Sequence, residues 1–516
     1  MSLIVSSVTT NGSEYPPRRS NSTPACAVCQ RRKTGQQVRC DRGLPCASCK
    51  KLGMLCTYTR KERQPSEGRS TLPLRPPGSN TTIATILALS QPGLVPDSGR
   101  QQSLTAGTSA SQASSLSHIF LERVHPLTKI KDASAVLILV SARAEGSCLT
   151  PSQEALVCAI FMASVVSLTE AECQETFSKS RPLAVLESRR NAEKALSAPG
   201  AMGCSELITL QASFFHALAL GSLGNFEAAW SLSGLVSRGA TTRLNNGEAF
   251  QMSAFETEMC RRLWWAAMIM DAQFADSIGQ QRSDAIACSQ YDMPSAINDS
   301  HFLPNMQELP LVGEKPKETI FALFVAKSFQ VMYSMSSPGT AGDVWDTLGS
   351  EDVSFDDKIS RITLAEQMLA KGILQHCNLS ERLHCYVINR ANALMERMYF
   401  TAFSSQVQTG QPSQDLLEHS KRLLSLYLEV CETNCLHIYR WHARSEFPWP
   451  ALTCLIRQVQ PREARIKDAD SQRDIIRRAV KVAREDLEVQ PRDLENLRLS
   501  DSLAKLLDRD LRLNLT

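Results

Sequence analysis

Six cysteines near the start of the chain constrain its fold more than any other feature. Two CxxC pairs are each followed by a lone cysteine, in the order Cys26-x2-Cys29-x10-Cys40-x5-Cys46-x2-Cys49-x6-Cys56. A CxxC pair places two thiolates on one turn at a separation that suits a tetrahedral zinc ion. Six thiolates either fill one zinc site with two left over, or hold two zinc ions through two bridging sulfurs. The repeated pattern favours the second arrangement, so we predict two Zn²⁺ per chain.

The segment that carries these cysteines is small and basic. A unit of about 31 residues has almost no core, so the metal would supply its folding energy. The first 70 residues hold 13 Lys and Arg against 4 Asp and Glu, whereas the remaining residues hold 43 against 49. This imbalance predicts contact with a polyanion, which we take to be double-stranded DNA, although a zinc knob for protein contacts is the alternative. The candidate DNA contacts are Arg31, Arg32, Lys33, Arg39, Lys50 and Lys51.

The cysteine-rich segment resembles the fungal binuclear zinc cluster DNA-binding domain, in the stretch CAVCQRRK…VRCDRGLPCASCKKLGMLC. The resemblance implies that Cys26 and Cys46 bridge the two metals. One zinc would be held by Cys26, Cys29, Cys40 and Cys46, and the other by Cys26, Cys46, Cys49 and Cys56. It also implies that the helix after the second cysteine enters the major groove over a CGG-type triplet.

The spacing departs from this family between the second and third cysteines. Ten residues separate Cys29 from Cys40, where six are usual, and deleting Thr34–Gln37 restores the pattern. Four residues make about one helical turn, or roughly 6 Å of rise, which a Zn–S bond of about 2.3 Å cannot absorb. The insert therefore loops out, or it damages the first zinc site, or it reflects a splice-site choice in the gene. Counting from the second cysteine puts the base-reading lysine at Lys33, which we prefer, and counting back from the third puts it at Gln37.

The zinc module is expected to span residues 23–63, between a disordered segment at 1–22 and a flexible linker at 64–116. The linker is rich in Pro, Ser, Thr, Gly and Gln, a composition that buries too little apolar area to fold. Its prolines interrupt any helix, and no heptad run is visible. A coiled-coil dimer is therefore not supported here, and a homodimer through another part of the chain remains open.

From about residue 117 the chain is expected to be all-α, because apolar residues recur at i, i+3, i+4 and i+7. Residues 117–460 are predicted to form a large regulatory domain, and residues 461–516 to add C-terminal helices with a candidate regulatory role. The expected helices are 116–124, 151–168, 170–178, 181–197, 205–222, 225–242, 254–279, 315–335, 356–375, 380–407, 413–440, 446–460, 470–487 and 492–510.

Two stretches of this region carry aromatic residues at helical spacing. They are EMCRRLWWAAMIMD, which starts at Glu258, and RWHARSEFPWPALTCLI, which starts at Arg440. Core packing accounts for such residues, with a paired buried charge in the first stretch. Both stretches, with FLERVHPLTKI, resemble the fungus-specific transcription factor regulatory domain, so the resemblance runs with gaps from about 24 to 460. Cys260 stands where arginine is usual, and GATTRLNN where a GLH-type turn is usual.

Several other classes of protein lack support in the sequence. The first residues have no charged region before an apolar run, so no secretory signal is expected. The longest nearly apolar run, 155–168, is too short to span a bilayer. Cys431, Cys435, His437 and His442 are a weak second zinc candidate, because one helix cannot aim all four at a point. No catalytic motif is visible, so the chain is not expected to be an enzyme.

The resemblance implies a nuclear, zinc-dependent, sequence-specific DNA-binding regulator of RNA polymerase II genes, which would act with the transcription machinery. Regulators of this kind often control secondary metabolism through a biosynthetic gene cluster. The alternative is a helical adaptor or corepressor whose inserted zinc module no longer binds DNA.

Overall fold

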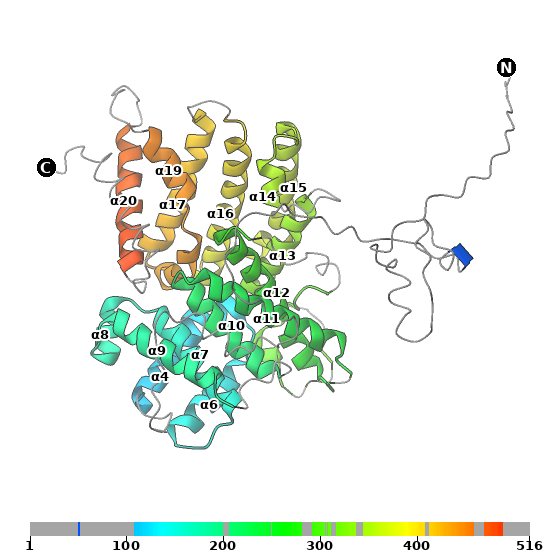
Figure 1. Cartoon of the computed structure of the whole chain (residues 1–516), viewed down its shortest axis with the longest axis vertical. Coiled ribbons are helices and arrows are strands. Elements are labelled where there is room, and N and C mark those ends of the chain that lie inside the picture. The colour runs from blue at the N-terminus through cyan, green and yellow to red at the C-terminus, as the bar shows by residue number, and fades with distance from the viewer. Residues whose placement is uncertain are drawn as a thin grey trace, which may run out of the picture. The chain divides into compact units, whose positions relative to one another are not determined.

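The computed structural model describes residues 50–51, 108–199, 206–248, 250–280, 291–304, 306, 308–310, 316–336, 344–407, 412–458 and 469–488. The chain divides into two units, residues 1–79 and 80–516. We call them the head and the body, and each is considered by itself. The described part of the body contains helices and no strand, which confirms the predicted all-α class (Figure 1).

The first helices of the body lie at one end of it (Figure 1). They are α4 (Ala110–Ile119), the π-helical turn η1 (Phe120–Val124), α5 (His125–Thr128), α6 (Ala133–Ala144), α7 (Pro151–Val166), α8 (Glu170–Phe177) and α9 (Arg181–Leu196). Next come α10 (Leu207–Ser222), α11 (Phe226–Asn245), α12 (Ala254–Ser277), η3 (Asp299–His301) and α13 (Ile320–Met335).

The remaining helices form the other end of the body, where α16, α17, α19 and α20 pack together (Figure 1). They are α14 (Val344–Gly349), α15 (Phe355–Gly372), η4 (Leu374–His376), α16 (Arg382–Ser404), α17 (Gln414–Glu432), η5 (His437–Tyr439), α18 (Arg440–Ala443), η6 (Arg444–Glu446), α19 (Trp449–Gln458) and α20 (Ala469–Glu488).

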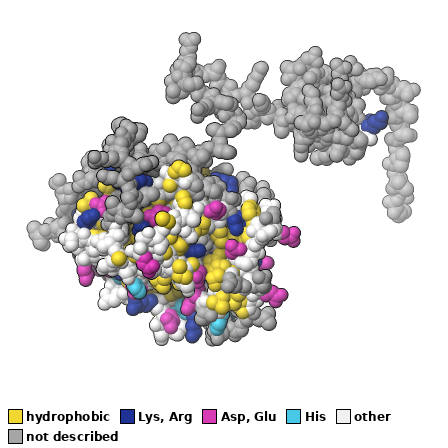
Figure 2. Space-filling view, turned by 90° about the horizontal axis from the view of Figure 1, so that it is seen from below, with side chains coloured by type: hydrophobic (Ala, Val, Ile, Leu, Met, Phe, Trp, Pro, Cys, Tyr) yellow, Lys and Arg dark blue, Asp and Glu magenta, His cyan; other side chains and the backbone are white. Residues whose placement is uncertain are grey.

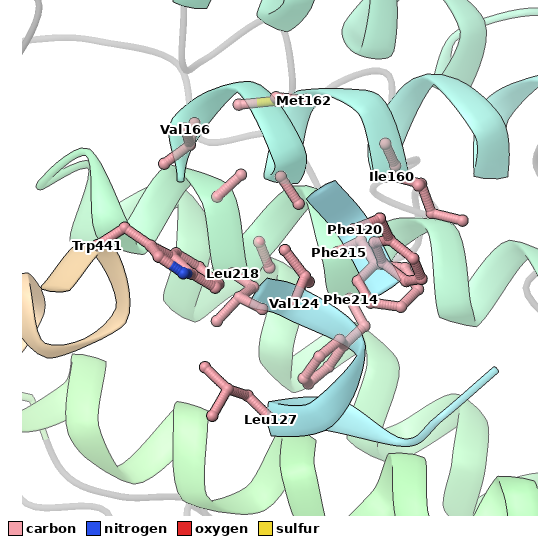
Figure 3. Packing of buried hydrophobic residues seen from close by; sticks show 14 of the residues in the cluster. Phe120, Val124, Leu127, Ile160, Met162, Val166, Phe214, Phe215, Leu218 and Trp441 are labelled. Carbon is pink, nitrogen blue, oxygen red and sulfur yellow. The ribbon is translucent and has the colours of Figure 1, made fainter. Parts of the chain in front are cut away.

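Helix α7 is at the centre of the largest apolar cluster. Pro151 occupies its first turn, and Thr150 forms a capping box with Gln153, so the sequence fixes where the helix begins. Almost every following residue is buried, because α7 packs against both α9 and α10. The Phe120 ring of η1 packs edge to face against the Phe215 ring of α10, with ring centroids 5.2 Å apart (Figure 3). Each such buried side chain contributes about 1.5–3 kcal/mol of transfer free energy.

Two further clusters extend the core toward the C-terminus. Trp264 and Trp265 of α12 pack with residues of α13, α14, α15 and α16. Leucines of α17 and α19 pack with Ile476 of α20, so residues 469–488 belong to the same packed body as the helices before them. Trp441 of α18 reaches back into the first cluster, which joins the two ends (Figure 3).

Most helices agree with the expected ranges within a few residues, and two of the differences have physical causes. Helix α6 was not predicted because its sequence ASAVLILVSARA has apolar residues on several faces, with Ile138 67% exposed, rather than one stripe. The expected helix 413–440 ends at Thr433, whose backbone is extended. Periodicity did not reveal this break, since Leu436 and Tyr439 beyond it are also buried. The short helix α14 was missed as well, and the expected helix 492–510 lies outside the described residues.

Candidate functional site

Of the twelve predicted metal-ligating and DNA-binding residues, ten lie outside the described part of the chain. Only Lys50 and Lys51 are described, and both are helical and exposed. Exposed ammonium groups on a helix can reach phosphate oxygens. The residues outside the described part are Cys26, Cys29, Cys40, Cys46, Cys49, Cys56, Arg31, Arg32, Lys33 and Arg39.

Figure 2 shows one face of the body, on which Lys and Arg side chains are interspersed with Asp and Glu. On this face, the mixed charge forms no extended basic patch of the kind that favours binding to a DNA backbone. The excess of basic residues lies in the head, because the first 70 residues contain 13 Lys and Arg but only 4 Asp and Glu.

The signature stretch EMCRRLWW lies on α12, where the predicted core helix with a paired buried charge is confirmed. Ser253 and Glu256 form a capping box that starts the helix. Trp264 donates from Nε1 to Thr241 Oγ1 at 3.0 Å, and Trp265 to the carbonyl of Asp292 at 2.9 Å. Both indoles are fully buried and satisfied, so they anchor α12 rather than offer a ligand surface.

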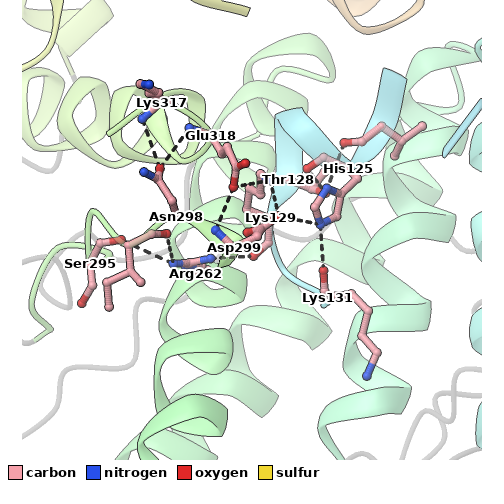
Figure 4. Close-up of polar contacts among 12 residues, drawn as sticks. His125, Thr128, Lys129, Lys131, Arg262, Ser295, Asn298, Asp299, Lys317 and Glu318 are labelled. Carbon is pink, nitrogen blue, oxygen red and sulfur yellow. Dashed lines mark hydrogen bonds and ion pairs between the residues drawn. The ribbon is translucent and has the colours of Figure 1, made fainter. Parts of the chain in front are cut away.

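Glu258 and Arg262 form the buried ion pair of this helix. The Arg262 Nε atom lies 2.9 Å from Glu258 Oε1, and neither side chain is exposed. Glu258 also accepts from the Ser295 amide at 2.7 Å. The remaining Arg262 nitrogens donate to the carbonyls of Lys129, Ser295 and Ile297 at 3.4 Å (Figure 4). Because every charged atom has partners, the pair tolerates its burial and fixes the loops around α12.

A turn at His125–Lys129, inside FLERVHPLTKI, joins the same network (Figure 4). Lys129 has a left-handed backbone with φ of 50°, and its Nζ lies 2.6 Å from Asp299 Oδ2. His125 Nε2 is 3.0 Å from the Lys131 carbonyl. Burial, helped by the Lys129 charge, lowers the pKa of His125 to about 4, so the ring is neutral at pH 7. Two of the three motifs quoted for the resemblance, EMCRRLWW and FLERVHPLTKI, therefore meet in one structural network.

Two positions depart from the family pattern, and the structure shows what each does. Cys260 is fully buried, its sulfur 3.6 Å from the Ala240 carbonyl, and burial raises the pKa of its thiol to about 12. It therefore packs as a small apolar residue against α11. The stretch GATTRLNN continues α11 through Asn245 and contains no turn before that residue.

The second zinc candidate is not assembled in the structure. His442 Nδ1 is 2.9 Å from Tyr386 Oη, and burial raises the pKa of the Cys431 thiol to about 12. Helix α17 ends at Glu432, so Cys431 lies on a different element from His437 and His442. Within the described ranges, no three His, Cys, Asp or Glu side chains are grouped as metal ligands.

Comparison with known families assigns both parts of the chain. Residues 24–65 match the fungal Zn(2)-Cys(6) binuclear cluster domain, and residues 118–342 match the fungal specific transcription factor domain. The chain belongs to the fungal binuclear zinc cluster transcription factors. The predicted resemblance is confirmed, and the head is a zinc-binding domain. Helices α14 to α20 lie beyond the residues matched by the second domain.

Curated relatives agree with this assignment. The chain is 23% identical to the transcriptional regulator AacuB of Aspergillus aculeatus, over 67% of this chain and 48% of that protein. It is 24% identical to the aurofusarin cluster transcription factor aurR2 of Gibberella zeae, over 69% and 54%. It is 26% identical to the pyriculol/pyriculariol biosynthesis cluster transcription factor 1 of Pyricularia oryzae, over 67% and 48%.

The matched part of this chain spans about half the length of these relatives. Their names are those of transcription factors, a class that is not enzymatic. In the described part of the chain, no helix is both long and apolar enough to cross a bilayer.

Sequence reasoning found the signature helix but missed the contacts that surround it. Glu258 stands four residues before Arg262, a spacing that could have identified the pair. No sequence signal links Glu258 to Ser295 or Lys129 to Asp299, since these partners are 37 and 170 residues apart.

Proposed function

We propose that this protein is a zinc-dependent, sequence-specific DNA-binding regulator of RNA polymerase II transcription that acts in the nucleus. The observation that carries the proposal is the match of residues 24–65 to the binuclear cluster domain, with all six cysteines inside it. The excess of cations in the same segment supports DNA as the partner.

The genes under its control are proposed to be those of a biosynthetic cluster. Two of the relatives are named after such clusters, the aurofusarin cluster and the pyriculol/pyriculariol cluster. None of the three relatives described above is named as an adaptor or corepressor, so no observation favours that alternative. The zinc module at 23–63, the regulatory domain and the C-terminal helices at 461–516 remain part of the proposal. The linker that starts at residue 64 must end before α4, because this helix begins at Ala110 and packs Ala113 and Leu116 into the core, so the expected boundary at 116–117 is too late.

The zinc ions would be two per chain, with Cys26 and Cys46 as the bridging ligands. Two Zn²⁺ and six thiolates carry a formal charge of about −2, which the surrounding cations offset. Zinc supplies the energy that folds the head when it is bound. Lys33 and the neighbouring arginines would then read guanine edges of a CGG triplet, while Arg39, Lys50 and Lys51 neutralise phosphates.

The insert Thr34–Gln37 would leave the helix as a loop, so that Cys40 still reaches its metal. Gly35 suits such a loop, since glycine adopts backbone angles that other residues avoid. The Lys33 side chain then stays with the first basic turn.

The test is DNA binding by the full chain, measured as fluorescence anisotropy. A CGG-containing duplex and a scrambled duplex are compared at several salt concentrations. We expect tighter binding to the CGG duplex and an affinity that falls steeply as salt rises. Cys46→Ser should abolish the preference, whereas Cys148→Ser, an exposed cysteine of the body, should keep it. Equal affinity of the unmodified protein for both duplexes would refute sequence-specific binding.

A further inference from the structure

A cavity of about 570 Å³ lies inside the body, between helices α12 and α13 on one side and α16, α19 and α20 on the other. Its volume is in the range of small-molecule sites, about 300–1,000 Å³. Aromatic side chains from four helices and from the loop before α19 form much of its wall, namely Phe321, Phe324, Trp345, Phe400, Phe447 and Trp449. Such a wall favours a flat apolar molecule.

Arg390 of α16 lines this cavity, and its guanidinium is incompletely hydrogen-bonded. Its side chain is only 7% exposed, yet its Nε and Nη1 atoms have no hydrogen-bond partner. Its one ion pair, from Nη2 to Glu446 Oε2, is 3.6 Å long, beyond normal hydrogen-bonding distance. Ser328 Oγ, also in the wall, is buried without a partner. Buried donors left unpaired are destabilising, so they favour a ligand that supplies acceptors.

The acidic side chains in the wall are already engaged. Glu446 accepts from Gln273 Nε2 at 2.9 Å in addition to its pairing with Arg390. Asp486 accepts from Tyr427, Arg440 and Arg444 at 2.9–3.0 Å. Asp276 pairs with Arg397 at 3.4 Å. Within the described wall, the groups that lack partners are therefore donors, and they would be satisfied by acceptor oxygens.

Arg262 offers a contrast within the body. Its side chain has a carboxylate at 2.9 Å and three carbonyl acceptors, and it does not line this cavity. Arg390 is also buried, but two of its guanidinium nitrogens have no hydrogen-bond partner and the residue lines the cavity.

We propose that this cavity is a binding site for an aromatic small molecule that carries an acidic oxygen group, held by Arg390 and Ser328. The aromatic wall would cover the apolar part, and the orphaned donors would receive the oxygens. The site is independent of the proposed DNA binding, because it uses only residues of the body.

A pair of fluorescent probes tests the site in the full chain. The probes are 8-anilinonaphthalene-1-sulfonate and N-phenyl-1-naphthylamine, which differ only by the sulfonate. We expect saturable binding of both, with the sulfonate at least about tenfold tighter, as a charge-assisted hydrogen bond would give. The double variant R390M/E446Q removes both charges and so leaves no unpaired ion. It should lose the preference for the sulfonate and still bind the neutral probe.

Two further variants keep the test decisive. R123M/E172Q removes a partly buried ion pair that lies outside the cavity wall and should bind both probes as the unmodified protein does. Ser328→Phe fills the cavity and should weaken both probes, while circular dichroism confirms that the helices remain. Absence of saturable sulfonate binding, or a preference unchanged in R390M/E446Q, overturns the proposal.

Discussion

The head and the body differ most in their cysteines. In the body, burial raises the pKa of the thiols of Cys158, Cys260 and Cys431 to about 12, so these residues stay protonated and pack as apolar side chains. In the head, six cysteines stand within a basic segment of about 31 residues, which is too short to build an apolar core of its own. We therefore expect the two units to draw their folding energy from different sources, metal ligation in the head and apolar burial in the body.

Zinc removal should separate the two units most sharply. Treating the full chain with a chelator should abolish specific DNA binding, because structural zinc supplies about 10–16 kcal/mol in small zinc modules. The body should keep its helical circular dichroism and its thermal midpoint. Adding zinc back is the control and should restore DNA binding. Survival of specific binding after complete zinc removal would break the comparison.

A change at Arg262 should destabilise the body and leave zinc binding by the head unchanged. Arg262→Met removes the fully buried partner of Glu258 and leaves that carboxylate with Arg261 and Ser295, so the body should lose about 3 kcal/mol of unfolding free energy. Urea unfolding measures this loss, and the zinc content of the head should not change. The matched control is R382M, which removes an exposed pair with Glu122 and should cost less than about 1 kcal/mol. A similar small loss in both variants would show that the Arg262 network is not structural.

Acid should weaken the body through its buried histidines. Burial lowers the pKa of His125 and His442 to about 4 and of His216 to about 3, from the ordinary value near 6.5. Between these values the unfolded chain binds protons that the folded chain does not. Stability is therefore full above about pH 6.5 and falls toward pH 4, by about 1.4 kcal/mol per pH unit for each histidine.

His216→Leu sharpens this prediction, because neither ring nitrogen of His216 has a partner. The unfolding free energy of the variant should depend less steeply on pH, by the equivalent of about one proton per chain. The unmodified protein, unfolded under the same conditions, is the reference for the slope. An unchanged slope in the His216 variant would contradict the burial of a neutral imidazole.

The smallest predicted effect concerns the start of α12. Ser253→Ala removes the cap that accepts from the Glu256 amide at 3.2 Å and should cost about 1 kcal/mol. Thermal unfolding measures the loss. The Ser231 hydroxyl bonds only the Glu227 carbonyl of its own helix, so Ser231→Ala should be close to neutral. Equal loss in both variants would show that the cap does not set the helix start.

The sequence contained enough to predict the helical class and the core role of α12, because Leu263, Ala267 and Met270 repeat on one face. The sequence could not show the cavity or the unpartnered nitrogens of Arg390, because the residues of the cavity wall are up to 262 positions apart, from Gly224 to Asp486. Helix α6 was not predicted because Leu137 and Ile138 are apolar but exposed, so its apolar residues do not follow the spacing of a single buried face. The local spacing of apolar residues therefore predicts helices, whereas a cavity between helices depends on packing of residues that are far apart in the sequence.

Native mass spectrometry of the full chain tests the central claim most directly, by counting zinc ions with and without Thr34–Gln37. The account predicts two ions per chain in both forms, each of which binds the CGG duplex. Fewer than two ions in both forms would contradict the binuclear cluster and, with it, the proposed regulator of transcription.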